Sequence, residues 1–128
     1  MAHVLVIDDD EAISRLYARW LSDSHVVAVV GTAKEALARI LAGERFDTIV
    51  CDVNMPGMSG FEFHAAASRI DAEQARRVVF VTAGPSRVGA PKRPNLPNPL
   101  LFKPFRADEL RTVVETFLPI RLSDRGGR

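Results

Sequence analysis

Five short apolar runs divide the sequence, and each is predicted to form a β-strand. Most are rich in valine and isoleucine, and their apolar residues are consecutive rather than alternating with polar ones. Continuous runs of this kind are typical of parallel sheets, which helices cover on both faces. The predicted strands are Val4–Ile7, Val26–Val30, Asp47–Cys51, Val78–Val81 and Leu100–Phe102.

Amphipathic helical patterns separate these runs. Capping boxes at Thr32–Glu35 and Ser59–Glu62 predict two helix starts, the second helix running to about Ile70. The first and last helices show apolar residues three and four positions apart, which predicts one buried face each. These residues are Ile13, Leu16, Tyr17, Trp20 and Leu21, then Leu110, Val113, Val114, Phe117 and Leu118. Alternating strands and helices predict an α/β fold, a doubly wound three-layer sandwich around a five-stranded parallel sheet.

The alternation breaks between residues 83 and 99. Five of the eight prolines of the chain fall in this segment. Because each interior proline costs a helix about 3 kcal/mol, we expect a long irregular loop here.

Length and charge are those of one ordinary domain. The chain has 128 residues and a formal net charge of +1, which gives no indication of nucleic-acid binding. We expect residues 1–120 to form the domain and residues 121–128 a polar tail.

No apolar run approaches the roughly 20 residues that span a bilayer, and the lone cysteine, Cys51, excludes an internal disulfide. A cytoplasmic protein without a membrane or direct nucleic-acid partner is the expectation.

Polar residues follow four of the predicted strands at their carboxyl ends. They are Asp8, Asp9, Asp52, Thr82 and Lys103. If the first strand is central, these strand ends meet at one edge of the sheet, where such folds bind ligands. Carboxylates this close raise one another's pKa, and a divalent cation removes that penalty. The sequence therefore predicts an acidic metal site at this edge.

Phosphoryl transfer suits this set of residues, because it depends mainly on positioning and on charge neutralisation. Asp52 is interpreted as the nucleophile that forms an acyl phosphate. Lys103 would pair with the phosphoryl oxygens, and the Thr82 hydroxyl would bond one of them.

Oxygen ligands favour Mg²⁺ at this site, and Mn²⁺ is expected to substitute for it. Asp9 and Asp52 would bind the metal directly, and Asp8 would act through water. The backbone carbonyl of Asn54 is the further ligand that we expect.

Four motifs carry a resemblance to a known family. They are VLVIDDDE at 4–11, CDVNMPGMSG at 51–60, VFVTA at 79–83 and FKPF at 102–105. In this order they resemble the receiver domain of response regulators in two-component signalling, over about residues 3–118. The resemblance implies a flavodoxin-like fold with strand order 2-1-3-4-5, Mg²⁺ dependence and a cis bond between Lys103 and Pro104.

The resemblance also implies partners and a mode of action. A sensor histidine kinase or a histidine phosphotransfer protein would donate the phosphoryl group, and a downstream protein target would respond to it. The chain would then be no enzyme beyond its own phosphorylation and dephosphorylation.

Two positions depart from the family pattern. Receivers usually carry an aromatic switch residue three positions before the lysine, and Leu100 stands there. The proline-rich segment replaces the usual fourth helix, which is therefore expected to be short or missing. Thr82 and Leu100 remain the candidate switch residues, and our hypothesis is that phosphorylation orders or shifts the 83–99 loop.

Two alternative functions stay open. Haloacid-dehalogenase-type phosphohydrolases also begin with a strand that ends in Asp-x-Asp, but Glu11-Ala12 does not fit their pattern. A degenerate receiver acting as an unphosphorylated adaptor would fit the departures at Leu100 and in the fourth-helix region. The complete set of acids, threonine and lysine argues against it.

Overall fold

Five parallel strands form a single sheet in the order β2-β1-β3-β4-β5. The computed structural model describes residues 2–83 and 94–116. The strand bounds are β1 His3–Ile7, β2 Val26–Val30, β3 Thr48–Asp52, β4 Val78–Thr82 and β5 Leu100–Phe102. The predicted flavodoxin-like order is confirmed, and it places β3 at the centre between β1 and β4.

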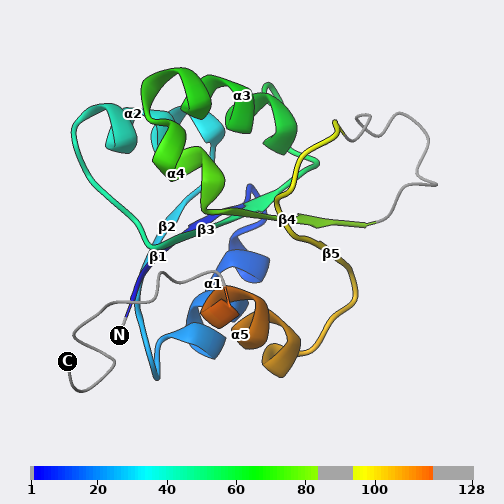
Figure 1. Ribbon diagram of the computed structural model, residues 1–128. Coiled ribbons are helices and arrows are strands. Elements are labelled where there is room, and N and C mark those ends of the chain that lie inside the picture. Colours follow the sequence, from blue (N-terminus) through cyan, green and yellow to red (C-terminus); the bar gives the residue numbers. More distant parts are fainter. Residues whose placement is uncertain (1, 84–93, 117–128) are drawn as a thin grey trace.

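Helices cover both faces of this sheet. Their bounds are α1 Glu11–Leu21, α2 Ala33–Leu41, α3 Gly60–Ile70, α4 Ala72–Arg76 and α5 Ala107–Thr116. Figure 1 shows α2, α3 and α4 on one side and α1 with α5 on the other. Each side has its own cluster of buried apolar residues, one around Phe63 and Phe80 and one around Tyr17 and Leu110. The three-layer sandwich is therefore confirmed.

Both predicted helix starts are capped, the one at Ser59 by a complete capping box, and Asp10 also caps α1. The Asp10 carboxylate accepts from the backbone N–H groups of Ala12 and Ile13, and the Thr32 hydroxyl accepts from that of Glu35. At the start of α3, Ser59 and Glu62 each bond the other's backbone N–H. These bonds satisfy N–H groups that a helix start otherwise leaves without a partner.

Strand bounds differ from the prediction by one residue in three strands, and the short helix α4 was not predicted. β1 begins at His3 rather than Val4, β3 spans Thr48–Asp52 rather than Asp47–Cys51, and β4 ends at Thr82 rather than Val81. Residues 94–99 form a loop, as expected. The rest of the fourth-helix prediction falls on residues 84–93, and the predicted tail falls on residues 117–128. Both segments lie outside the described residues.

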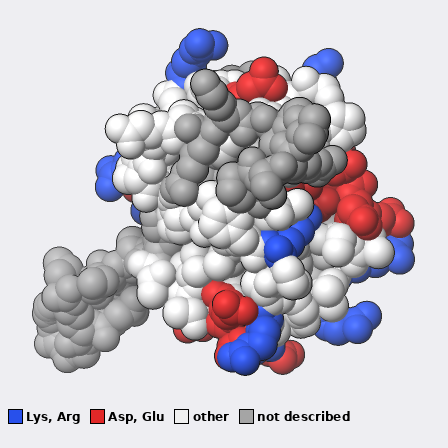
Figure 2. Space-filling model, turned by 90° about the vertical axis from the view of Figure 1, so that its right-hand side faces the viewer, with Lys and Arg blue, Asp and Glu red and all other residues white. Residues whose placement is uncertain are grey.

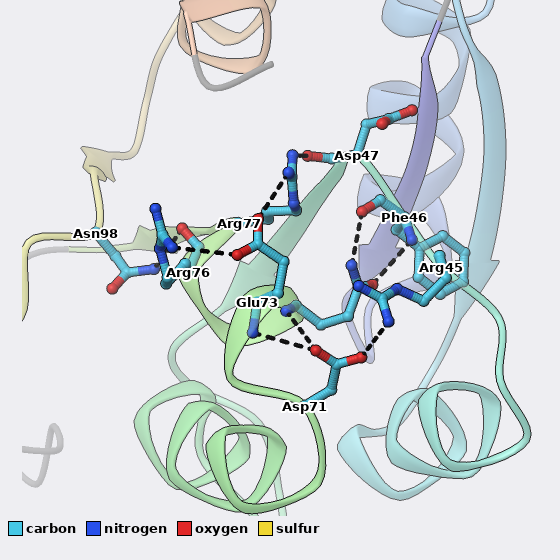
Figure 3. A network of polar contacts seen from close by, with 9 residues as sticks. Arg45, Phe46, Asp47, Asp71, Glu73, Arg76, Arg77 and Asn98 are labelled. Atoms are coloured by element: carbon cyan, nitrogen blue, oxygen red, sulfur yellow. Dashed lines mark hydrogen bonds and ion pairs between the residues drawn. The ribbon is translucent and has the colours of Figure 1, made fainter. Parts of the chain in front are cut away.

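Buried amides fasten the amino-terminal edge of the sheet, which Figure 3 shows. The Gln74 side chain of α4 both donates to the Phe46 carbonyl and accepts from the Phe46 N–H. The Asn98 side chain donates to the carbonyls of Ala75 and Val78. This edge therefore holds α4 and the 94–99 loop against β3 and β4, opposite the edge where the predicted site lies. None of the described helices is long and apolar enough to cross a membrane.

Candidate functional site at the carboxyl edge of the sheet

The carboxyl ends of four strands bring the predicted site residues together. Asp8 follows β1, Asp52 and Thr82 end β3 and β4, and Lys103 follows β5. Cα pairing aligns Ile7 with Cys51, Asp52 with Val81 and Thr82 with Phe102, so these ends share one edge. Figure 2 looks at the side that lies to the right in Figure 1, and an acidic patch there borders a basic side chain.

Three carboxylates form the centre of the site. One oxygen from each of Asp8, Asp9 and Asp52 lies within 4.8 Å of the other two. Asp8 and Asp52 are only 3% and 6% exposed, whereas Asp9 is exposed. Asp8 Oδ1 accepts from the backbone N–H of Asp10 at 2.9 Å, but its buried Oδ2 accepts no hydrogen bond from any described residue. An orphaned carboxylate oxygen in a group of acids has the chemistry of a cation ligand.

Lys103 lies between two of these acids. Its Nζ is 4.0 Å from Asp8 Oδ2 and 3.9 Å from Asp52 Oδ1, and its side chain is about one-third exposed. Both distances are those of ion pairs, beyond hydrogen-bond contact. One lysine therefore offsets only part of the charge of three carboxylates.

Burial weakens the acidity of the central carboxyls. The pKa of Asp52 is raised to about 6, mainly by burial and also by the Asp8 charge, although Lys103 and the Asn54 N–H lower it. Burial likewise raises the pKa of Asp8, although its bond from Asp10 and the charge of Lys103 oppose this. Both directions follow from holding negative charge away from water.

Asn54 connects two other site residues. Its backbone N–H donates to Asp52 Oδ1 at 3.2 Å, and its side-chain Nδ2 donates to Thr82 Oγ1 at 3.3 Å. The sequence predicted the Asn54 backbone carbonyl as a metal ligand, but it did not predict the bond from the Asn54 side chain to Thr82. The position of Asn54 two residues after Asp52 was the available signal.

Comparison with known proteins decides the family. The sequence model of the response regulator receiver domain matches residues 4–115. The chain belongs to the response regulator receiver domain family. Among solved structures, the chemotaxis response regulator CheY4 of Vibrio cholerae has a TM-score of 0.74 at 32% identity, covering 92% of this chain and 99% of that one.

Curated relatives of this receiver domain are longer proteins. A protein-glutamate methylesterase/protein-glutamine glutaminase of Bacillus licheniformis is 37% identical over 65% of the chain and 23% of its own length. The heme response regulator HssR of Staphylococcus aureus is 37% identical over 48% of the chain and 28% of its own length. The chain thus spans about a quarter of these relatives. Receiver domains belong to two-component signalling, so the family supports a signalling role over that of a phosphohydrolase.

The loop after Asp52 in this receiver domain depends on two glycines. Gly57 has a φ of +83°, a conformation that residues with a Cβ rarely adopt. At Gly60 an added Cβ would lie 2.6 Å from the Asp52 carbonyl oxygen, and the Gly60 N–H donates to the Val53 carbonyl. The first residue of α3 therefore sits directly on the backbone that carries Asp52.

Leu100 occupies the position of the usual aromatic switch residue. It is half-buried, pairs with Phe80 in the sheet and packs against the core cluster on the α3 face. A leucine already packed in this way has no ring to exchange between an outer and an inner position. The usual aromatic relay is therefore absent from this receiver domain at residue 100.

Proposed function

We propose that Asp52 of this receiver domain accepts a phosphoryl group from a histidine of a partner protein. The observation that supports this is the convergence of three carboxylates, one lysine and one threonine at the carboxyl ends of four strands. An Asp52 oxygen attacks the phosphorus, a P–O bond forms, and the P–N bond to the histidine breaks. The electron pair stays on the imidazole nitrogen, which takes up a proton. The product on this chain is an acyl phosphate.

A magnesium ion fits the donor set. The buried Asp8 Oδ2 lacks a hydrogen-bond partner among the described residues, and the three carboxylate oxygens lie within 4.8 Å. Asp9 and Asp52 would hold Mg²⁺ directly, Asp8 through water, and the Asn54 carbonyl would complete the protein ligands. The bound ion would neutralise charge on the phosphoryl oxygens. Mn²⁺ prefers the same oxygen ligands and would substitute.

Lys103 and Thr82 supply the remaining contacts. The Lys103 ammonium, now about 4 Å from both buried acids, would move onto a phosphoryl oxygen of phosphorylated Asp52. Thr82 Oγ1 accepts from the Asn54 side chain, and its hydroxyl would donate to the phosphoryl group. Both contacts stabilise charge that the unmodified site does not carry.

The donor would be a sensor histidine kinase or a histidine phosphotransfer protein, and a downstream protein would respond to the phosphorylated form. Because residue 100 is a leucine that packs against the core cluster, we infer that the response does not use an aromatic relay. Thr82, Leu100 and the 83–99 segment are the proposed switch elements. The site chemistry needs neither a nucleic acid nor a membrane, and it suits the cytoplasm, where kinases find ATP.

Phosphotransfer tests this proposal directly. The wild type and Asp52→Asn are incubated with acetyl phosphate, with Mg²⁺, with Mn²⁺ or with excess chelator, and then with candidate phosphorylated kinases. We expect metal-dependent label on the wild type and none on Asp52→Asn. A correctly folded wild type that takes no label from any donor would instead support the degenerate-receiver alternative. Repeated turnover of a generic phosphate ester would support the phosphohydrolase.

A further inference from the structure

Three aromatic rings join α1 to the segment that carries Lys103. The ring centroid of Phe105 lies 5.4 Å from that of Tyr17 and 6.2 Å from that of Trp20, and the latter two are 5.7 Å apart. Phe105 follows Lys103 by two positions. We call Tyr17, Trp20 and Phe105 the aromatic cluster. None of its members is among the site residues named above.

The aromatic cluster is fixed to the core on its far side. Tyr17 is 4% exposed and belongs to the buried cluster of the α1 and α5 face, and both other rings pack against that cluster. Arg111 Nε of α5 donates to the Trp20 carbonyl at 3.0 Å. Figure 1 shows α1 and α5 side by side beneath the sheet. Phe105 therefore packs on a surface that two helices hold in place.

Lys103 itself has few contacts that fix it. Its ammonium reaches Asp8 and Asp52 only at ion-pair distance, and four rotatable bonds separate it from the backbone. The backbone N–H of Lys103 donates to the Thr82 carbonyl at 2.8 Å. On the carboxyl side Pro104 is exposed, so Phe105 is the first side chain that packs on the core. The lysine thus lies between two anchors, one at β4 and one at the aromatic cluster.

We propose that the aromatic cluster positions Lys103 for the chemistry at Asp52, with Phe105 and Tyr17 as positioning residues. The inference rests on the proposed function, since it assumes that Lys103 meets the phosphoryl group. A displacement of about 1 Å in a catalytic group can slow a reaction about 100-fold, so partial loosening should slow phosphorylation about tenfold. Removal of a ring should therefore slow phosphorylation because it loosens the position of Lys103.

Initial rates with acetyl phosphate and Mg²⁺ are the first measurement. We expect Phe105→Leu and Tyr17→Leu to react about tenfold more slowly than the wild type, and Tyr17→Phe, which keeps the ring, to react normally. Phe61→Leu is the matched control. It removes a ring contact with Phe80 at a centroid distance of 4.8 Å on the opposite face of the sheet. Its rate should stay unchanged.

The second measurement follows the lysine. Mn²⁺ bound at the carboxylates broadens the NMR signal of the Lys103 ε-methylene, and the broadening falls steeply with distance. It should weaken in Phe105→Leu and persist in Phe61→Leu. If Phe105→Leu does not fold, Phe105→Met, which is close to it in volume, takes its place.

The outcomes separate the two proposals. A normal rate for Phe105→Leu, or a slower rate with unchanged Lys103 broadening, overturns the positioning role and leaves the proposed function intact. A wild type that takes up neither phosphoryl group nor metal overturns the proposed function and the positioning role with it.

Discussion

The fold disfavours the ionised form of the Asp52 carboxyl. Burial raises the pKa of this carboxyl from 3.8 to about 6, in spite of the nearby Lys103. Between these values the native state binds more protons than the unfolded chain, so stability falls as the pH rises through this window. We predict that Asp52→Asn increases the free energy of unfolding by about 2 kcal/mol at pH 7, and that the gain disappears near pH 4.

Urea unfolding at both pH values, without divalent metal, measures this difference. Asp23→Asn is the matched control, because Asp23 is exposed and a substitution there should change stability little. An unchanged or lower stability of Asp52→Asn at pH 7 would contradict the prediction.

Gly60 is the residue whose backbone contact most directly fixes Asp52. A Cβ at this position would approach the Asp52 carbonyl oxygen to 2.6 Å and the Val53 Cα to 2.9 Å. Backbone atoms cannot yield as a flexible side chain can, so Gly60→Ala should lower the free energy of unfolding by about 2 kcal/mol or more. Thermal and urea denaturation would detect this, with Gly31→Ala as control, since its Cβ meets only one atom at 3.8 Å. Equal stabilities of the two variants would refute the argument.

Single residues of the site were largely predictable, because a polar residue that directly follows a buried parallel strand lies at the carboxyl edge of the sheet. Asp8, Asp52 and Lys103 meet as their strand-end positions indicate. The position of Asn54 indicated that it lies near the site, but not that its Nδ2 donates to Thr82 Oγ1. This bond joins residues 28 positions apart through a side-chain rotamer, and only the packed structure sets that rotamer.

At the scale of elements, Asn98 fastens the loop before β5. Its buried Nδ2 donates to the carbonyls of Ala75 and Val78, at 3.0 and 2.9 Å. Asn98→Ala would leave buried acceptors without this donor, so we predict a loss of about 2 kcal/mol in the free energy of unfolding. Asn95→Ala changes an exposed residue of the same loop and should have little effect. Urea titration of both variants distinguishes a local clamp from a general sensitivity of the loop.

Helices and strands were predicted correctly where the hydrophobic pattern extended over a long enough stretch, and α4 was missed. This helix has only five residues, too few to show an apolar stripe. Its signal was present in the cap, since Asp71 accepts from the backbone N–H groups of Glu73 and Gln74. No role was predicted for Gln74, which is 1% exposed and pairs with both backbone groups of Phe46. A buried amide is invisible to a hydrophobic pattern.

For the whole molecule, metal binding should stabilise the native state. The unfolded chain does not hold three carboxylates together, so Mg²⁺ at about 100 times its dissociation constant should add about 2.7 kcal/mol. We predict a rise in Tm at pH 7 that a chelator reverses and that Asp9→Asn reduces. The rise should shrink below pH 6, because Asp52 then takes up a proton. Differential scanning fluorimetry with and without Mg²⁺ provides the measurement, and a Tm that ignores the ion at pH 7 would count against the site.

The architecture of the described residues was predictable from the order of the strands and helices. Uninterrupted apolar strands required helices on both faces, and the four motifs added the strand order. The contacts at the edge opposite the site could not be predicted from the sequence. There the side chains form hydrogen bonds with backbone groups of distant segments, and they come from Gln74, Asn98 and Arg77. Such contacts depend on which loops fold back onto the sheet, and local sequence patterns do not indicate this.

Cys51 lies one position before Asp52 in the central strand β3, fully enclosed, and burial raises the pKa of its thiol well above the ordinary value. An alkylating reagent reacts with the thiolate, which the buried site disfavours. Cys51 is therefore alkylated only when the sheet opens around β3 and exposes the sulfur to water. Since the chain has no other cysteine, alkylation kinetics report that opening at one position, next to the proposed phosphoryl acceptor Asp52. Slower alkylation after incubation with acetyl phosphate would indicate that phosphorylation of Asp52 stabilises β3.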